Sequence, residues 1–476
     1  MTKETGGTAY KTLVSALKRQ TRGITVADIA AKTALPLERI RDLIPRAADE
    51  YNARLQVSES GEILYSFPRG FTSRYRGFGP ALGRFFEKAA AALKVFFAAV
   101  FKVWIMVMLV GYFVLFFLIT LAALVFAAAA SSSGKDRDRR SSGGPGNGYV
   151  LSRMMNMVLR FWFYRSIMNT GYSGGYGRGR KAEDERPLYK KVFSFVFGDG
   201  DPNKGWAQKE AMELIGYIRK KNGVISLPEF VIRSGLDFQR AEREILAYCV
   251  NYGGMPEATE DGTVVYRFDS LLPGSEKDSS RDAPSLKGPW KFSANKDGLN
   301  AAFALINAVN LGFGGYFLYF ALNPAAVNVS GFSYLFHFVY GSLAGLGVSP
   351  LAPVAAGLGV VPVLFSLFFW IVPAVRRARI KKKNAAIDFE NRRKQGFAAV
   401  WDAPLEVTED LFGKDAGRLI REIGSYSVPD VVIDSRGKTV YSFKELDEEK
   451  KALEKYRRGI DKNRGDPGAV VFDSDG

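Results

Sequence analysis

Oxygen-bearing side chains alternate in one short segment, and their spacing is the closest approach to metal chemistry in this chain. Asp199, Asp201 and Asn203 stand at every second position, as the first ligands of a calcium-binding loop do. Glu210 occupies the twelfth position counted from Asp199, where such a loop places its bidentate carboxylate. The spacing alone therefore raises the hypothesis of a calcium site.

The residues between these oxygens favour a different interpretation. The sixth position of a calcium loop requires glycine for its sharp turn, and here it is Lys204. Gly198 and Gly200 instead predict a tight turn, in which Asp199 or Asp201 caps the helix that follows. The turn is the preferred interpretation, and we expect no bound metal.

Cys249 and His337 are the only cysteine and the only histidine. One of each excludes a disulfide framework and a zinc site with several Cys or His ligands. Cys249 lies in an apolar run and is predicted to be a small buried hydrophobic residue. His337 lies in a long uncharged segment, where an ionisable group is a functional candidate; a neutral imidazole at an interface is the favoured alternative.

No arrangement of nucleophile, base and orienting acid is recognisable. A Ser-His-Asp or Cys-His site would have to use His337, which is remote in sequence from every candidate partner. Phosphate-binding loops and dinucleotide fingerprints are absent as well. We therefore expect a protein that is not an enzyme and that needs no cofactor.

The segment 298–375 contains 78 residues without Asp, Glu, Lys or Arg. A soluble domain needs a charged or polar wetted face, so this length predicts a membrane-embedded block of two or three spans. The best spans are Leu299–Leu322 and Ala352–Val375, and Phe332–Leu346 between them fits a short third span, a re-entrant element or an interfacial helix. Basic residues for the membrane surface follow at Arg376, Arg377 and Arg379.

A second membrane segment is predicted at 84–130, either as one span or as a tight hairpin near Gly111. The linker 131–204 follows, and it contains a predicted amphipathic interfacial helix at 149–168. That helix would place three guanidinium groups at anionic lipid headgroups: Arg153, Arg160 and Arg165.

A strand, turn and strand pattern occurs three times. In each case a tyrosine and a phenylalanine follow a turn glycine by four and six positions. Residues two apart share one face of a strand, so both rings can close the hairpin onto preceding helices. The repeated residues are Gly61, Tyr65 and Phe67, then Gly262, Tyr266 and Phe268, then Gly437, Tyr441 and Phe443.

The helices before these hairpins also correspond. Thr25 with Asp28, and Ser226 with Glu229, form the capping-box pattern of a helix start. In the first copy a further helix is predicted to end near Pro45. The third copy is shorter and degenerate. Three helices followed by a two-stranded wing resemble the winged-helix fold over about 60 residues per copy.

The segment Phe193–Asn203 resembles a segment of a family of bacterial multi-pass membrane proteins that carry winged-helix-like repeats. The resemblance implies no reaction. The predicted fold class is a multi-domain protein with α-helical membrane segments and two or three small α+β winged-helix-like units on the cytoplasmic side. The boundaries are 8–70 for unit one, 84–130 for the first membrane segment, 131–204 for the linker, 205–270 for unit two, 271–297 for a second linker, 298–375 for the membrane block, 376–446 for unit three, and 447–476 for a charged helix with a disordered tail.

Charge decides between the functions that such an architecture allows. The formal net charge is +17, yet the helices that would enter a DNA groove, Leu37–Glu50 and Asp237–Ala247, are both net acidic. The sequence predicts a non-enzymatic scaffold of a cell (inner) membrane, crossing it several times, with lipid headgroups and a protein or second copy as partners. A membrane-tethered DNA-binding regulator and a transporter or channel component are the alternatives.

Overall fold

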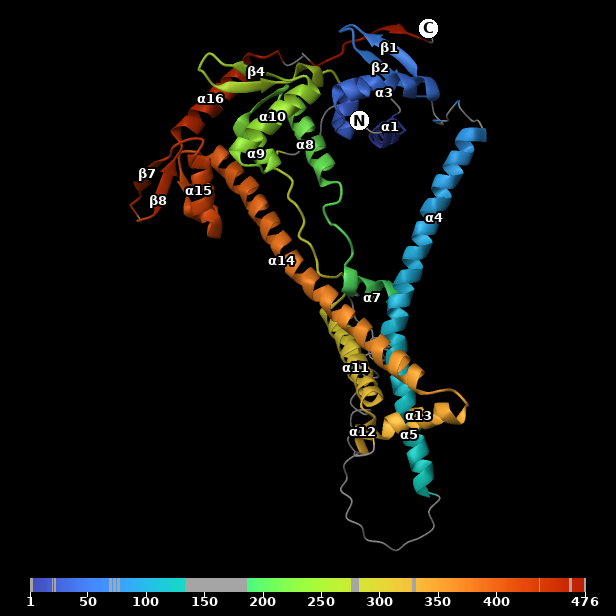
Figure 1. Cartoon of the computed structure of the whole chain (residues 1–476). Coiled ribbons are helices and arrows are strands. Elements are labelled where there is room, and N and C mark those ends of the chain that lie inside the picture. Colours follow the sequence, from blue (N-terminus) through green and yellow to red (C-terminus); the bar gives the residue numbers. More distant parts are fainter. Residues whose placement is uncertain are drawn as a thin grey trace, which may run out of the picture. The chain divides into compact units, whose positions relative to one another are not determined.

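The structure is a computed structural model of the whole chain (Figure 1). It describes residues 3–18, 20, 23–67, 71, 74, 78–132, 186–274, 282–327, 331–435, 437–461 and 465–474. The predicted interfacial helix at 149–168, with Arg153, Arg160 and Arg165, lies outside the described residues.

The chain forms two compact units. The polar unit comprises residues 1–87, 201–290 and 382–476, and the apolar unit comprises residues 88–200 and 291–381. The fold is mostly helical, with three small sheets among the described residues. The domain boundaries given above remain predictions.

Three of the described helices are long and apolar enough to cross a membrane, by length and composition: Lys88–Ala129, Asp297–Leu322 and Pro353–Asp402. The first combines α4 (Phe78–Met106), a π-helical turn η1 (Val107–Gly111) and α5 (Tyr112–Ser132). Because backbone helicity continues through Gly111, the alternative of a tight hairpin at this glycine is wrong. A single glycine costs a helix only about 1 kcal/mol, which is too little to break a helix of this length.

The later membrane block contains two of these long helices and a short one. Helix α11 spans Asp297–Leu322, and α14 (Val361–Asp402) continues from the π-helical segment η4 (Pro353–Val360). Between them lie α12 (Pro324–Val327), η3 (Gly331–Ser333) and α13 (Tyr334–Gly345). Helix α13 has 12 residues, or about 18 Å, which is too short to cross alone.

The π-helical segments coincide with polar contacts inside the apolar unit. Asn310 of α11 donates from Nδ2 to the carbonyl of Leu109 at 2.8 Å, and Tyr112 donates to the carbonyl of Gly357 at 2.9 Å. A π turn displaces carbonyl groups from the regular ladder, and a neighbouring helix can then satisfy them. These donors therefore join α11 to η1 and α5 to η4.

The first module of the polar unit contains three helices and a hairpin. Thr25 caps α2 and accepts from Asp28 N–H at 3.1 Å, so the predicted capping box is confirmed. The elements are α1 (Lys3–Leu17), α2 (Val26–Thr33), α3 (Leu37–Glu50), β1 (Arg54–Ser58) and β2 (Ile63–Ser66).

The prediction that the helix ends near Pro45 is wrong, because α3 continues to Glu50. Ile40, Ile44 and Ala47 are fully buried along one face. Their packing outweighs the roughly 3 kcal/mol that an interior proline costs a helix.

The second module also has three helices followed by a hairpin, with an added short strand after its first helix and a 3-10 turn at its end. Its helices and strands are α8 (Trp206–Lys220), β3 (Val224–Ser226), α9 (Leu227–Ser234), α10 (Phe238–Tyr252), β4 (Met255–Ala258), β5 (Val264–Arg267) and the turn η2 (Asp269–Leu271).

The third module is more irregular, as the sequence predicted. The C-terminal part of α14 precedes short 3-10 turns instead of a full second helix. Its elements are β6 (Val407–Thr408), η5 (Glu409–Leu411), η6 (Gly413–Asp415), α15 (Ala416–Gly424), β7 (Asp430–Ile433) and β8 (Thr439–Ser442), followed by α16 (Lys444–Gly459).

The three hairpins share one register around the repeated tyrosines. Tyr65 lies opposite Leu55 and Ile24, Tyr266 opposite Pro256 and Ile225, and Tyr441 opposite Val431 and Val407. The turn glycines all have positive φ, at 80°, 80° and 75°. Each phenylalanine two positions on is buried, and a fully buried ring contributes about 1.5–3 kcal/mol. Tyr65 and Tyr266 are buried as well, whereas Tyr441 is only partly buried, and the packing role of the repeated residues stays a prediction.

The expected disorder of the C-terminal tail is wrong for residues 465–474. Strand β9 (Val470–Asp473) pairs antiparallel with β1, and Asp473 accepts from Arg54 at 2.6 Å and from Gln56 at 2.7 Å. An edge strand exposes unpaired backbone groups, and the tail satisfies them. Acidic composition alone could not indicate this pairing.

One core joins the modules of the polar unit. It includes Leu17 and Ile40 from the first module, Phe230 from the second, and Phe412 and Ile420 from the third. The modules are therefore parts of one packed body and not beads on a flexible chain.

The buried carboxyl group of Glu449 on α16 makes this body sensitive to pH. Burial raises its pKa to about 7, against the hydrogen bond from Tyr426 (3.0 Å), which lowers it. The folded state therefore holds a proton that the unfolded state releases, and stability is greatest below the ordinary pKa of 4.5.

We expect the polar unit to lose roughly 1–3 kcal/mol as the pH rises from 5 to 8. Thermal melting of the full-length protein in detergent at several pH values measures this loss, and Glu449→Gln should flatten the profile. A slope that Glu449→Gln leaves unchanged would assign the dependence to another group.

Candidate functional site

Helix α7 (Leu188–Phe197) carries the distinctive segment identified in the sequence. Its side chains Val192, Ser194 and Val196 are buried at alternate positions, while phenylalanines flank them on both sides. The helix ends at Gly198 (φ 81°), and Gly200 (φ 99°) turns the chain again. Positive φ is unfavourable for residues with a Cβ, so the predicted tight turn is confirmed.

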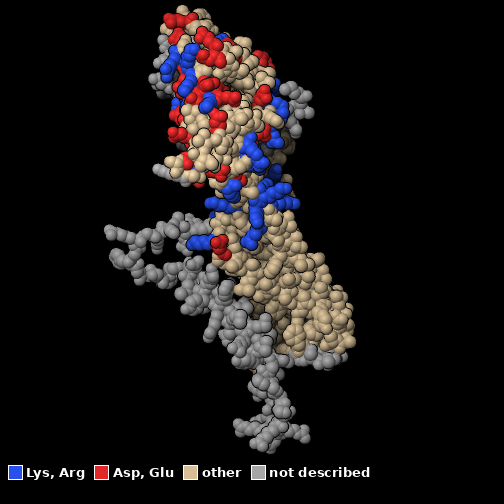
Figure 2. Space-filling view, turned by 90° about the vertical axis from the view of Figure 1, so that its left-hand side faces the viewer, with Lys and Arg blue, Asp and Glu red and all other residues tan. Residues whose placement is uncertain are grey.

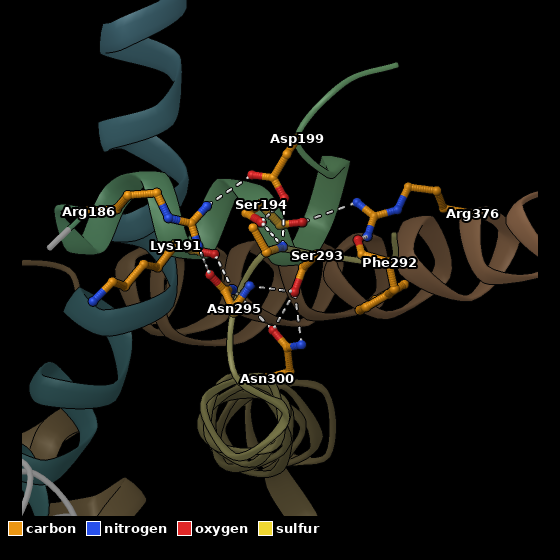
Figure 3. A network of polar contacts seen from close by, with 10 residues as sticks. Arg186, Lys191, Ser194, Asp199, Phe292, Ser293, Asn295, Asn300 and Arg376 are labelled. Carbon is orange, nitrogen blue, oxygen red and sulfur yellow. Dashed lines mark hydrogen bonds and ion pairs between the residues drawn. The ribbon is translucent and has the colours of Figure 1, made fainter. Parts of the chain in front are cut away.

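Asp199 collects three donors immediately after this turn (Figure 3). Its carboxylate accepts from Ser194 Oγ at 2.7 Å, from the backbone N–H of Ala294 at 2.7 Å and from Arg186 at 3.1 Å. A carboxylate with several donors is strongly held. Asp199 therefore fastens α7 to the chain that enters α11.

The segment before α11 adds a ring of amide and hydroxyl groups (Figure 3). Asn295 accepts from Arg186 at 3.0 Å and donates to the carbonyl of Lys191 at 2.8 Å and to Asn300 at 3.1 Å. Asn300 donates to Ser293 at 2.9 Å. The ring fixes the start of α11 against α7.

Arg376 of α14 completes the network. Its guanidinium group donates to the carbonyl of Ser194 at 3.3 Å and to the carbonyl of Phe292, and it lies 4.4 Å from the ring centroid of Phe292. Arg377 lies over the same ring at 5.1 Å. Three segments remote in sequence thus meet at one basic end of the apolar unit.

The network has the chemistry of a binding and positioning site. Of its two serine hydroxyls, Ser194 donates to a carboxylate and Ser293 bonds Asn300, and no histidine is part of the network. Nothing in the network supplies an imidazole base for an activated nucleophile. In this network Arg376 donates only to neutral carbonyl groups, so its positive charge can attract an anion.

The side chains with the spacing of a calcium loop do not gather around one site. Asp201 accepts from the backbone N–H of Asn203 at 2.9 Å, and Asn203 exchanges hydrogen bonds with Gly288. Glu210 pairs with Lys394 at 2.5 Å. No cluster of His, Cys, Asp or Glu suited to a metal ion occurs in the described part of the chain.

The predicted capping of the next helix by Asp199 or Asp201 is wrong, because the N-cap of α8 is Gly205 and no side chain caps the helix. Asp199 is held by the network instead, and Asp201 closes a local turn. Cys249 is buried as predicted, and burial raises the pKa of its thiol to about 11. His337 lies on α13 with an exposed side chain.

The two units differ in their content of charged residues. Figure 2 shows acidic and basic side chains intermixed over the polar unit, whereas most of the visible apolar unit is free of both. The described apolar unit contains two acidic residues, Asp199 and Asp297, and twelve basic residues. Basic residues thus outnumber acidic ones sixfold in the described part of the apolar unit.

Two ion pairs join parts of the polar unit through the capping-box acids. Asp28 accepts from Arg219 at 2.8 Å, with 1% and 5% of these side chains exposed. Glu229 accepts from both terminal nitrogens of Arg457 at 2.9 and 2.6 Å, and from Tyr217 at 2.8 Å. Each acid thus caps a helix and binds an arginine of another element.

The exposed face of α10 carries apolar side chains among charged ones. Leu246 is 47% exposed and Val250, one turn later, is 82% exposed. Glu242, Arg243 and Glu244 on the same helix are exposed as well. An exposed apolar pair with mixed charges offers more to a protein surface than to DNA phosphates.

Sequence reasoning singled out Asp199 and Arg376 but missed Ser194, which contacts both, and the neighbouring Asn295 and Asn300. Asn295 and Asn300, which stand on either side of the start of the uncharged segment, were the available signal, since amides at a membrane boundary need partners. The repeated glycines, tyrosines and phenylalanines lie in the three hairpins and not at this site.

The chain is similar to a chloroplastic protein of Arabidopsis thaliana that is described as uncharacterized. The two are 27% identical over 407 residues, which cover 80% of this chain and 71% of the relative. No protein-family model matches the chain. No solved structure matches it either.

Proposed function

We propose that the chain is an integral membrane protein that displays winged-helix-like protein-interaction modules at one surface of its membrane. Its role is that of a non-enzymatic scaffold or assembly protein. The shared register of the three hairpins supports a relation between the modules as repeats. The family of bacterial multi-pass proteins that Phe193–Asn203 resembles belongs to the same proposal.

The contacts inside the polar unit support a single membrane face for all three modules. The pair Asp28–Arg219 links the first module to the second, and Glu229–Arg457 links the second to α16, which follows the third. Buried pairs of this kind require the partners in one compartment. The proposed face is the cytoplasmic one. Because the relative is described as chloroplastic, the proposed membrane is either a cell membrane or a plastid membrane.

The exposed apolar pair on α10 is the observation that carries the interaction role. In DNA-binding helix-turn-helix modules the corresponding helix presents Arg, Lys, Asn or Gln to base edges. Here it presents Leu246 and Val250 beside Glu242 and Glu244. The favoured partner is a protein with an apolar contact of its own.

We expect the double variant Leu246→Asp, Val250→Asp to lose the partner. Tagged full-length protein would be purified from its own membranes after chemical crosslinking, and the variant should recover at least about tenfold less partner, since buried anchors carry most binding energy. Val432→Asp on β7, which is 59% exposed, is the matched control.

Equal partner recovery by the double variant and the control would contradict the interaction role. Titration of duplex DNA onto the purified full-length protein tests the alternative, a membrane-tethered DNA-binding regulator. The proposal expects only weak, salt-sensitive binding, and submicromolar affinity at near-physiological salt would overturn it.

A further inference from the structure

We propose that the motif-bearing helix α7 and the basic end of the apolar half of α14 form a binding groove for one anionic lipid. The inference rests on the proposed membrane location and adds a defined site to it. The groove has a volume of about 340 Å³ and is lined by Val196, Phe197, Ile371, Val372, Val375, Arg376 and Arg379. That volume is at the small end of the range for ligand pockets, about 300–1,000 Å³.

The lining has an apolar part and a basic part, which match the acyl chain and the anionic headgroup of a lipid. Five of its seven residues are apolar, and the two arginines follow one another on α14 three residues apart. Residues with this spacing lie on neighbouring positions of a helix face. An acyl chain can therefore lie along the valines and Ile371 while its anionic headgroup meets both guanidinium groups.

The surface beside the groove is suited to hydrocarbon. Trp370 is 51% exposed, Ile371 57% and Val375 45%. These residues belong to a helix that is long enough to cross a membrane. Apolar side chains exposed so densely on such a helix contact acyl chains. A chain from the bilayer can enter the groove without leaving its apolar surroundings.

The charge of the two arginines is available to a ligand. Arg376 is positioned by the carbonyls of Ser194 and Phe292, which are neutral, and neither arginine pairs with a carboxylate in the part of the chain that the structure describes. Asp199, the acid of the adjoining network, is engaged by Arg186, Ser194 and Ala294. A phosphate or sulfonate headgroup supplies the missing anion, and arginine binds such groups through paired donors.

The arrangement gives the segment Phe193–Asn203 a role. Val196 and Phe197 form one wall of the groove, and the turn at Gly198 brings Asp199 into the network that holds α7. The polar network is thus the support of the groove, and its arginine is shared by both.

The test measures lipid binding to delipidated full-length protein in detergent. Phosphatidylglycerol, phosphatidylcholine with the same chains, and inorganic phosphate are titrated while thermal stability is recorded. We expect saturable stabilisation by phosphatidylglycerol only. In the variant Arg376→Gln, Arg379→Gln the affinity should fall roughly tenfold or more, because each basic residue near an anionic lipid contributes severalfold.

Two further variants keep the test decisive. Val375→Trp fills the groove without changing charge and should weaken phosphatidylglycerol binding likewise, even where the arginine variant fails to fold. Lys190→Gln, Lys381→Gln removes two charges outside the lining and should bind normally. Equal binding by all variants, equal stabilisation by phosphatidylcholine, or stabilisation by inorganic phosphate alone would overturn the lipid site. Partner recovery through Leu246 and Val250 is a separate readout, so loss of the lipid site leaves the interaction role standing.

Discussion

Replacing Glu229 by alanine is expected to destabilise the second module by about 3–5 kcal/mol. The carboxylate is 3% exposed and accepts from Tyr217, from two nitrogens of Arg457 and from the backbone N–H of Ser226. Its removal leaves a largely buried guanidinium group without its anion and deprives α9 of its capping acid.

Hydrogen exchange of the full-length protein, followed by mass spectrometry, localises this loss to α8, α9 and α16. Asp261→Ala is the control, because it removes a carboxylate from an exposed pair with Lys455 and should cost less than about 1 kcal/mol. Similar protection in Glu229→Ala and Asp261→Ala would show that the buried pair does not hold these elements together.

Replacing Asp28 by alanine is expected to have an effect of similar size, about 3–5 kcal/mol, at the junction of the first two modules. Arg219 then lies at 5% exposure without its partner, and the N-terminus of α2 loses its capping box. Hydrogen exchange should increase in α2 and α8 together.

The double variant Asp28→Ala, Arg219→Met separates the two causes. Removing both charges should recover much of the loss, since an uncompensated buried charge costs more than the pair contributes. If the double variant is as unstable as Asp28→Ala, the cap and not the ion pair is responsible.

The parts of this fold that depend on local sequence could be predicted. Turn glycines, alternating apolar residues and capping boxes act within a few positions of the chain, and the three hairpins and the start of α2 follow from them. Length without charge likewise indicated helices suited to a membrane. Each repeated tyrosine stands four positions after its turn glycine, and this common spacing matches its common pairing with one residue on either side.

The remaining features depend on partners that are distant in sequence. Asp28 and Arg219 are 191 residues apart, and Glu229 and Arg457 are 228 apart. A capping box gives no signal that its acid will also receive an arginine. The same holds for β9, whose pairing with β1 is decided by the edge that the first hairpin leaves open. It holds also for Asp199, because one of its donors, Ala294, lies 95 residues away.

For the same reason, only part of the candidate site could be predicted from the sequence. Arg376 was identifiable from the positive flank of a span, but its groove requires α7 to lie beside α14. The segment Phe193–Asn203, which includes the end of α7, stands out in the sequence, but nothing in it indicates that the helix lies against α14. Packing of remote elements, and not any single motif, creates the site.

Accessibility of the three hairpin turns tests the central claim most directly. Glu59, Glu260 and Ser435 each stand two residues before a turn glycine and are exposed. Each is replaced by cysteine in a Cys249→Ala background, and sealed vesicles of known orientation are treated with a membrane-impermeant thiol reagent. The account predicts labelling of all three positions from the cytoplasmic side. Labelling of any one of them only from the opposite side would contradict a scaffold that presents its modules at a single membrane face.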